Sequence, residues 1–166
     1  MTLWSRRRSG ALRGLDLDIP RGSRTALVGP SGCGKSTLAR LLLRLYDPTE
    51  GRMLLDGTDA REYDAASIRA RAGLVTSEAS LFNDTVFQNV ALGLKVVTLS
   101  EVERACQSVG AHAFIEALPE GYQTLLGEWG FSLSAGQRQK LALARVLLKD
   151  PEFVVLDEAT AHLDGP

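Results

Sequence analysis

The sequence has little cysteine. Cys33 and Cys106 are the two cysteines among 166 residues, and neither lies in a Cys-x-x-Cys pair or a Cys/His cluster. This scarcity argues against a disulfide framework and against a zinc site. It indicates a protein of a reducing compartment such as the cytoplasm.

The sequence also lacks an excess of charge of one sign and a long apolar run. With 19 Lys and Arg against 20 Asp and Glu, the formal net charge is -1, which argues against a nucleic-acid-binding protein. The basic run 6–8 is interpreted as a solvated loop. A bilayer span needs about 20 apolar residues, whereas the densest stretch, 38–46, is broken by Arg40 and Arg44. Because Met1 is not followed by a signal-peptide pattern, a membrane role requires docking onto other segments that cross the bilayer.

Strand-like and helix-like segments alternate along the chain. The patterns predict strands over 12–19, 25–28, 53–55, 73–75 and 153–156, and helices over 36–46, 65–71 and about 134–148. Between Thr85 and Leu118 the strand signals disappear, and Ser100 with Glu103 forms a capping-box pattern ahead of a further helix. This order predicts an α/β fold with a helical insert in its middle.

A glycine-rich segment between a predicted strand and a predicted helix fits the phosphate-binding pattern G-x-x-x-x-G-K-[ST]. It consists of Gly29, Pro30, Ser31, Gly32, Cys33, Gly34, Lys35 and Ser36, and Thr37 follows it. Such glycines let backbone N–H groups point at phosphate oxygens beside a helix N-terminus. We expect Lys35 to reach the β- and γ-phosphates of ATP and Ser36 to hold Mg²⁺. The alternative is a purely structural glycine-rich turn, and Cys33 receives no redox role.

A pair of carboxylates follows the predicted strand 153–156. Asp157 and Glu158 stand at its end, where Asp157 is expected to hold the metal and Glu158 to orient or deprotonate the attacking water. Alone, an apolar run followed by Asp-Glu is a weak signal that also marks ordinary strand ends. After a phosphate-binding loop, it makes Lys35 and Glu158 the candidate catalytic residues.

The segment Leu133-Ser134-Ala135-Gly136-Gln137-Arg138-Gln139 resembles the LSGGQ signature of ATP-binding cassette (ABC) transporter ATPases. The order of phosphate loop, signature and Asp-Glu is also the order in that family. In the family, the signature binds the γ-phosphate of an ATP held by the opposite subunit. The resemblance therefore implies that Ser134, Gly136 and Gln137 contact ATP in a head-to-tail dimer of two cassettes.

Further segments resemble the family. Trp4 lies where the family places an aromatic residue that stacks on adenine, although a core tryptophan is the alternative. Segment 161–164 resembles the D-loop of the dimer interface. Segments 81–86 and 124–130 resemble the Q-loop tail and the TxVGExG segment of exporters, which contact the coupling helices of the transmembrane domain. These resemblances imply an exporter-like cassette.

Three features depart from the family pattern. The Q-loop glutamine, expected after Thr76, is Ser77, whose shorter side chain leaves only a weak expectation of a metal contact. Ala135 replaces the first paired glycine of the signature, a mild change wherever the backbone does not need a positive φ. The family's switch histidine lies well beyond the Asp-Glu pair, at a position past Pro166 that neither His112 nor His162 can fill, so we expect a cassette truncated at its C-terminal end.

The resemblance implies one ABC nucleotide-binding domain over 1–166. Its P-loop NTPase core, a mixed sheet with flanking helices, is expected over 1–80 and 146–166, and a helical subdomain with the signature over about 81–145. The implied function is hydrolysis of ATP, with Mg²⁺, to power export. The implied partners are a second cassette and a transmembrane domain or subunit, with the chain at the cytoplasmic face of a membrane and with no nucleic acid.

Alternatives stay open. One is a catalytically impaired module or gene fragment that binds ATP without efficient hydrolysis, as Ser77 suggests. Another is a soluble ABC protein of DNA repair or translation, against which the exporter-like segments count. A small-molecule kinase would leave the LSAGQ segment unexplained.

Overall fold

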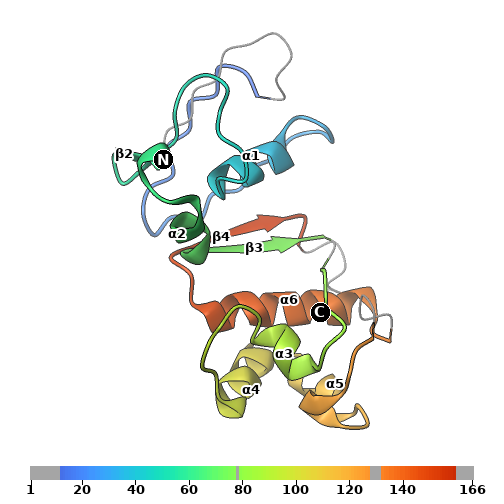
Figure 1. Ribbon diagram of the computed structural model, residues 1–166. Helices are drawn as coiled ribbons and strands as arrows, with labels where there is room; N and C mark the ends of the chain where they lie inside the picture. The colour runs from blue at the N-terminus through green and yellow to red at the C-terminus, as the bar shows by residue number, and fades with distance from the viewer. Residues whose placement is uncertain (1–11, 78, 128–131, 160–166) are drawn as a thin grey trace. The chain divides into compact units, whose positions relative to one another are not determined.

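The computed structural model describes residues 12–77, 79–127 and 132–159. The chain divides after Ala72 into two compact units, and each is described by itself. The first unit holds α1 (Lys35–Leu42), β1 (Leu54–Leu55), β2 (Thr58–Asp59), the 3-10 helix η1 (Ala60–Glu62) and α2 (Ala65–Ala70). The second holds most of β3 (Ala72–Thr76), α3 (Val86–Val90), α4 (Leu99–Ser108), α5 (His112–Glu116), the 3-10 helix η2 (Gly121–Gln123), α6 (Ala135–Lys149) and β4 (Phe153–Asp157) (Figure 1).

Helix α1 ends earlier than the predicted span 36–46. Arg44 adopts a left-handed φ of 48°, and the N–H of Leu45 donates to the carbonyl of Arg40 at 2.9 Å. This is the Schellman pattern that closes helices, here with an arginine in place of the usual glycine. The Arg44 side chain bonds Asp47 at 3.0 Å and the carbonyl of Tyr63, and these bonds hold the turn. The prediction that Asp47 and the proline after it end the helix was therefore wrong by about one turn.

The predicted strand over 53–55 and its tight turn are confirmed. β1 pairs antiparallel with β2, with Leu55 opposite Thr58. Asp56 and Gly57, the two residues between the strands, have φ values of 49° and 84°. Two successive positive φ values define the type I′ hairpin turn, for which Asp-Gly is a preferred sequence.

Two predicted strands are absent from the described part of the chain. Segments 12–19 and 25–28 carry no strand, and neither is paired in either of the two-stranded sheets. Leu15, Leu17 and Ile19 are half-buried between exposed neighbours, so the predicted alternation of burial is present without a ladder. In segment 25–28, Val28 is 95% exposed, so no described strand or helix covers that side chain. A strand needs a neighbour for its backbone hydrogen bonds, and a short apolar run does not specify one.

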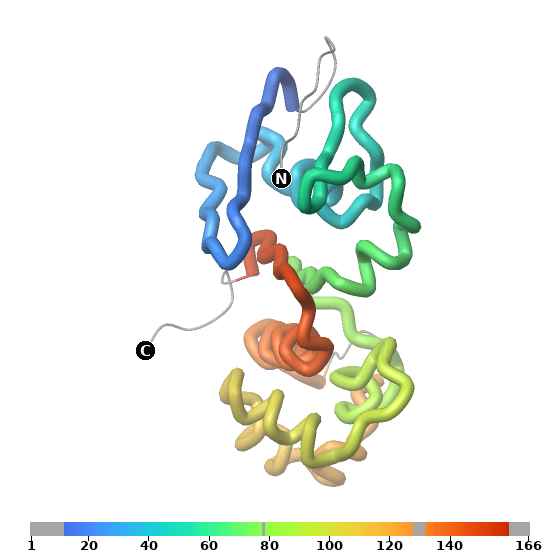
Figure 2. Tube along the Cα trace, turned by 90° about the vertical axis from the view of Figure 1, so that its left-hand side faces the viewer, coloured from blue at the N-terminus to red at the C-terminus, as the bar shows by residue number. Residues whose placement is uncertain are grey.

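Helix α6 is the centre of the second unit. It lies between the β3–β4 pair and helices α3 to α5 in both views of the backbone (Figures 1 and 2). One of its faces adds Leu141 and Ala144 to the apolar cluster of α3, α4, α5 and η2. The other face packs Ala142 and Val146 against Val75 of β3 and Ala159 beyond β4. The predicted helix from about 134 to 148 is thus confirmed, with both faces buried.

The predicted strand over 153–156 is confirmed as β4. Its residues alternate, with Val154 and Leu156 47% and 57% exposed and the residues between them half-buried. β3 and β4 run side by side in the same direction (Figure 1), whereas β1 and β2 are antiparallel. The architecture is therefore α/β, as predicted.

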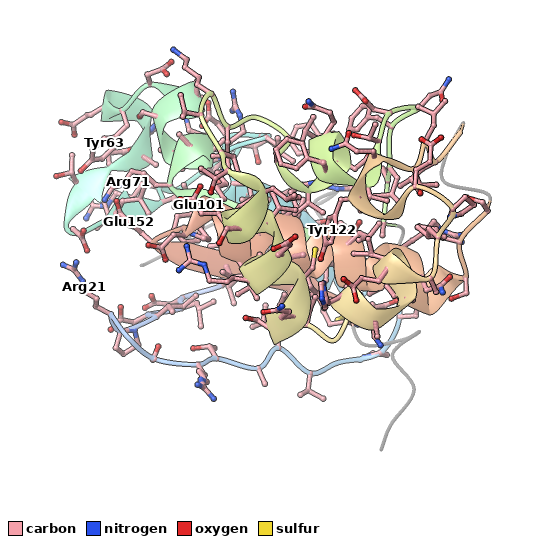
Figure 3. The ribbon with its side chains drawn as sticks, turned by 90° about the horizontal axis from the view of Figure 1, so that it is seen from below. Arg21, Tyr63, Arg71, Glu101, Tyr122 and Glu152 are labelled. Atoms are coloured by element: carbon pink, nitrogen blue, oxygen red, sulfur yellow. The ribbon has the colours of Figure 1, made fainter. Side chains whose placement is uncertain are left out.

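The predicted capping box lies two residues earlier than expected. Thr98, not Ser100, is the N-cap of α4: its hydroxyl accepts from the N–H of Glu101, and the Glu101 carboxylate accepts from the N–H of Thr98 at 2.8 Å. Both sequences, 98–101 and 100–103, fit the box pattern, and Leu99 begins the helix. Figure 3 labels Glu101 at this helix start and Tyr122 among the helices of the unit.

Within the described residues, no helix combines the length and apolar character that a bilayer crossing requires.

Candidate functional site

The glycine-rich loop of the first unit leads directly into α1. Gly34 is the N-cap of the helix with a φ of 103°, and Gly32 has a φ of 79°. A methyl group at Gly32 would meet open space, so backbone conformation rather than crowding favours glycine there. At Gly29 the added carbon would lie 2.7 Å from the sulfur of Cys33, which shows how tightly the loop turns.

Lys35 folds back over this loop. Its ammonium group donates to the carbonyl oxygens of Gly29 at 2.9 Å and Pro30 at 3.0 Å. Helix α1 begins without a side-chain cap, so its first turn keeps N–H groups for an outside acceptor. Ser36 is exposed and Thr37 half-buried in that turn. A cation and a free helix N-terminus at one loop suit an anion such as a phosphate chain.

The two carboxylates of the second unit follow β4 in sequence. Asp157 is the last residue of the strand and is half-buried, while Glu158 is exposed. Glu158 has a left-handed φ of 55°, which costs a non-glycine residue about 1–2 kcal/mol. The Lys35 loop belongs to the first unit, so the structure describes these two parts of the predicted site separately.

The signature segment begins α6. Ser134 is the N-cap, and its hydroxyl oxygen accepts from the N–H of Gln137 at 3.2 Å. In return, the side-chain oxygen of Gln137 accepts from the N–H of Ser134 at 2.8 Å. Ala135 and Gly136 lie in the first helical turn, where a negative φ suits alanine as well as glycine. The expectation that Ala135 is a mild change is confirmed at the level of backbone geometry.

The two segments predicted to be exporter-like pair with each other as far as they are described. Thr85 and Leu125 form an antiparallel bridge, and the N–H of Leu126 donates to the carbonyl of Asp84 at 3.1 Å. Asn89 is buried and holds the first segment through its amide, which donates to Phe82, Asp84 and Thr85 carbonyls at 3.0–3.2 Å. Sequence reasoning found both segments and missed Asn89.

Two side chains of α6 hold the segment that contains Ser77, and sequence reasoning missed both. Gln139 donates to the carbonyl of Thr76, directly before Ser77, and to that of Ala159, directly after Glu158, at 3.2 and 2.8 Å. Arg145 donates to the carbonyls of Ser80 at 3.2 Å and Asn89 at 2.8 Å, and its burial lowers the pKa of the guanidinium. The sequence did contain a signal for a role of these two side chains, because both are polar residues in a helix whose other inward positions are apolar.

Several predicted site residues lie outside the described part of the chain. These are Trp4, residues 128–130 of the TxVGExG-like segment and the D-loop-like segment 161–164. Ser77 is described, half-buried in a bend after β3.

Known proteins share this sequence and this fold. A family model described as ABC transporter matches residues 12–161. The chain is 51% identical over 153 residues to the ATP-dependent lipid A-core flippase of Chromohalobacter salexigens, a match that covers 92% of the chain and 26% of the flippase. It is 48% identical to the ATM1-type heavy metal exporter of Novosphingobium aromaticivorans, over 92% of the chain and 25% of the exporter. The chain thus spans about a quarter of the length of these relatives.

A solved structure of a bacterial Atm1-family ABC exporter with ATP bound matches with a TM-score of 0.91 and 45% sequence identity. This match covers 98% of the chain and 29% of the exporter chain. Because the family model spans nearly the whole sequence and the exporter structure shares its fold at this identity, the chain belongs to the ABC transporter family and has the fold of its ATPase domain.

Proposed function

We propose that the chain binds MgATP, hydrolyses it and thereby powers export as the ATP-binding part of an ABC transporter. The observation that carries this proposal is the loop at residues 29–34, whose left-handed glycines lead into a helix that begins with the folded-back Lys35 and has no side-chain cap. The names of the relatives, a flippase and a heavy metal exporter, support the direction of transport.

The proposed roles follow from the chemistry of each side chain. The backbone of residues 29–34 and the ammonium of Lys35 bind the phosphates, and Trp4 stacks on the adenine. Ser36 and Asp157 would hold Mg²⁺, which when bound neutralises charge on the β- and γ-phosphates. A serine hydroxyl and one carboxylate fit this metal, because Mg²⁺ usually keeps waters and takes further oxygens from the substrate phosphates. Glu158 orients or deprotonates the water that attacks the γ-phosphate.

The signature requires a second cassette. Ser134, Gly136 and Gln137 stand at the N-terminal end of α6, a favourable place for an anion. Since the first cassette already binds the ATP phosphates through its own loop, we propose that this signature contacts the γ-phosphate of an ATP on a partner cassette, head to tail. The proposed domain division places the P-loop NTPase core at 1–80 and 146–166 and a helical subdomain at about 81–145. The apolar cluster of α3, α4, α5 and η2 against α6 supports such a helical unit.

The transmembrane partner is proposed to contact the paired segments 81–86 and 124–127. Phe82 and Leu125 are 54% and 62% exposed there, and the bridge at Thr85 holds the two segments together. Such a partner would place the chain at the cytoplasmic face of a membrane.

A second candidate function is ATP binding without efficient hydrolysis. Ser77 favours it, because serine at the Q-loop position reaches less far than glutamine towards a metal ion or an attacking water. In that case Mg²⁺ contact at this position runs through a water, and ATP binding persists while turnover is slow.

The test compares Lys35→Ala with Arg40→Ala in the protein in its full encoded length. Arg40 is an exposed cation of the same helix, so its loss controls for charge and for helix stability. Lys35→Ala is expected to abolish phosphate release from MgATP, and Arg40→Ala to leave it within about twofold. Equal phosphate release by the two variants would contradict the proposed phosphate site. MgATP binding with no phosphate release by the unaltered protein would select the second candidate.

A further inference from the structure

Gln139 is the most deeply buried polar side chain of α6. It is 1% exposed, on the face of the helix that also carries Ala142 and Val146. An amide in such a place costs about 1–3 kcal/mol unless its hydrogen bonds are made. Its nitrogen makes two, to Thr76 and Ala159, and both acceptors are backbone carbonyls of the segments that carry the proposed catalytic chemistry.

No described residue pairs with the oxygen of the same amide. Gln139 Oε1 is buried and has no hydrogen-bond partner among the described residues. A methionine of similar length would avoid the cost of this unpaired acceptor. Packing alone therefore gives a poor reason for glutamine at position 139, and the two donated bonds give a better one.

The bond to Ala159 bears directly on Glu158. Glu158 has the left-handed φ of 55°, and the carbonyl that accepts from Gln139 belongs to the next residue. A left-handed non-glycine residue persists only where its surroundings hold it. The amide holds the Ala159 carbonyl at 2.8 Å, one residue beyond Glu158, and so restrains the backbone that sets the direction of the Glu158 side chain.

We infer that Gln139 is a positioning residue for ATP hydrolysis: its buried amide ties the backbone after Glu158 and the end of β3 to the helix that begins with the signature. The inference rests on the proposed role of Glu158 as the residue that activates water. One amide thus holds the glutamate in its left-handed conformation and fixes the residue directly before Ser77. A displacement of α6 at the signature is passed to both segments through this single side chain.

The test is Gln139→Met in the protein in its full encoded length. Methionine keeps the length of the side chain and removes the donor, so kcat for ATP is expected to fall roughly 10- to 100-fold, the cost of a misplaced catalytic group. KM for MgATP is expected to change less than about twofold, because the phosphate loop is untouched. The matched control is Val146→Ala, which removes packing from the same cluster without removing a hydrogen bond and is expected to leave kcat unchanged.

Gln139→Glu gives a second readout that a merely structural role would not move. Once ionised, its carboxylate faces two carbonyl oxygens without a proton to donate, whereas the protonated acid regains a donor. The kcat of Gln139→Glu relative to the unaltered protein is expected to rise as the pH falls, while that of Gln139→Met stays flat. Parallel pH profiles of the two variants would overturn the inference.

A double-variant cycle decides whether Gln139 acts through Glu158. If it does, Gln139→Met causes no further loss of residual turnover once Glu158→Gln is present. A further 10-fold loss in the double variant, or a kcat of Gln139→Met equal to that of Val146→Ala, overturns the inference alone. Unchanged turnover in Glu158→Gln by itself would overturn the proposed role of Glu158 as the residue that activates water, and the inference with it.

Discussion

Ser134 is expected to do two separable things, and two substitutions separate them. Its hydroxyl oxygen caps α6 by accepting from the N–H of Gln137 at 3.2 Å, which leaves the hydroxyl proton to donate to a phosphate oxygen. Ser134→Ala removes the cap acceptor and the phosphate donor together. Ser134→Asp keeps a cap acceptor but brings no proton and adds a negative charge where a phosphate is expected.

The magnitude follows from the capping box. Ser134→Ala loses one of its two bonds, while the bond from the Ser134 N–H to Gln137 at 2.8 Å remains possible. The loss of an N-cap acceptor costs about 1 kcal/mol of stability, or about 2–4 °C in Tm for a domain of this size. Aspartate is as good a cap as serine and favours the helix N-terminus by up to about 1 kcal/mol. We therefore expect Ser134→Asp to be at least as stable as the unaltered protein, and Ser134→Ala to be the least stable of the three.

Turnover is expected to rank differently from stability. With ATP as substrate, the unaltered protein is expected to have the highest turnover. Turnover of Ser134→Ala is expected to be lower by roughly 10-fold or more, because alanine has no proton to donate to the phosphate. Turnover of Ser134→Asp is expected to be the lowest, because the aspartate charge repels the phosphate. Thermal melting and phosphate release, measured on the same three proteins, give the two rankings. Turnover of Ser134→Asp equal to that of serine would refute the phosphate contact. An unchanged Tm of Ser134→Ala would refute the cap.

Three further predictions concern the packing and the helices. Gly73→Ala places a methyl 2.6 Å from Val146 and is expected to cost about 1–3 kcal/mol of stability, measured by denaturant unfolding, with Val146→Ala restoring most of it. Burial raises the pKa of the Cys106 thiol to about 11, so its contribution to stability is full below about pH 8.5 and lost as the pH rises to about 11. Unfolding at stepped alkaline pH should show this decline, and Cys106→Ala should flatten it. Thr98→Ala is expected to lower stability by about 1 kcal/mol and Ser100→Ala by almost nothing, and the reverse order in thermal melts would contradict the observed cap.

Local signals in the sequence were enough for the elements that depend on neighbouring residues. The Asp56-Gly57 turn, α2 and α6 were predicted because turn chemistry and helical periodicity act over a few residues. The end of α1 was missed because Arg44 adopts a left-handed conformation that a sequence pattern assigns to glycine. The strands predicted over 12–19 and 25–28 are absent from the described structure, because pairing is a property of two segments and one segment does not reveal its partner.

For the site, motifs predicted the residues that are proposed to meet substrate, and gave no role to the side chains that hold the backbone beside them. Lys35 and Asp157 could be proposed from a phosphate-loop motif and a strand that ends in Asp-Glu, and Ser134 from the resemblance to the family signature. Gln139 and Arg145 received no role: their polar side chains interrupt the apolar face of α6, but no residue type marks their acceptors, which are backbone carbonyls of Thr76, Ala159 and Ser80. Carbonyls belong to every residue, so only three-dimensional placement shows which of them a buried side chain needs.

The most direct test of the account is phosphate release and nucleotide binding by the unaltered protein and by Glu158→Gln, with MgATP as substrate. The account predicts that the unaltered protein binds MgATP and releases phosphate, and that Glu158→Gln binds MgATP with similar affinity and releases almost none. Equal phosphate release by both proteins, or no MgATP binding by either, would contradict it.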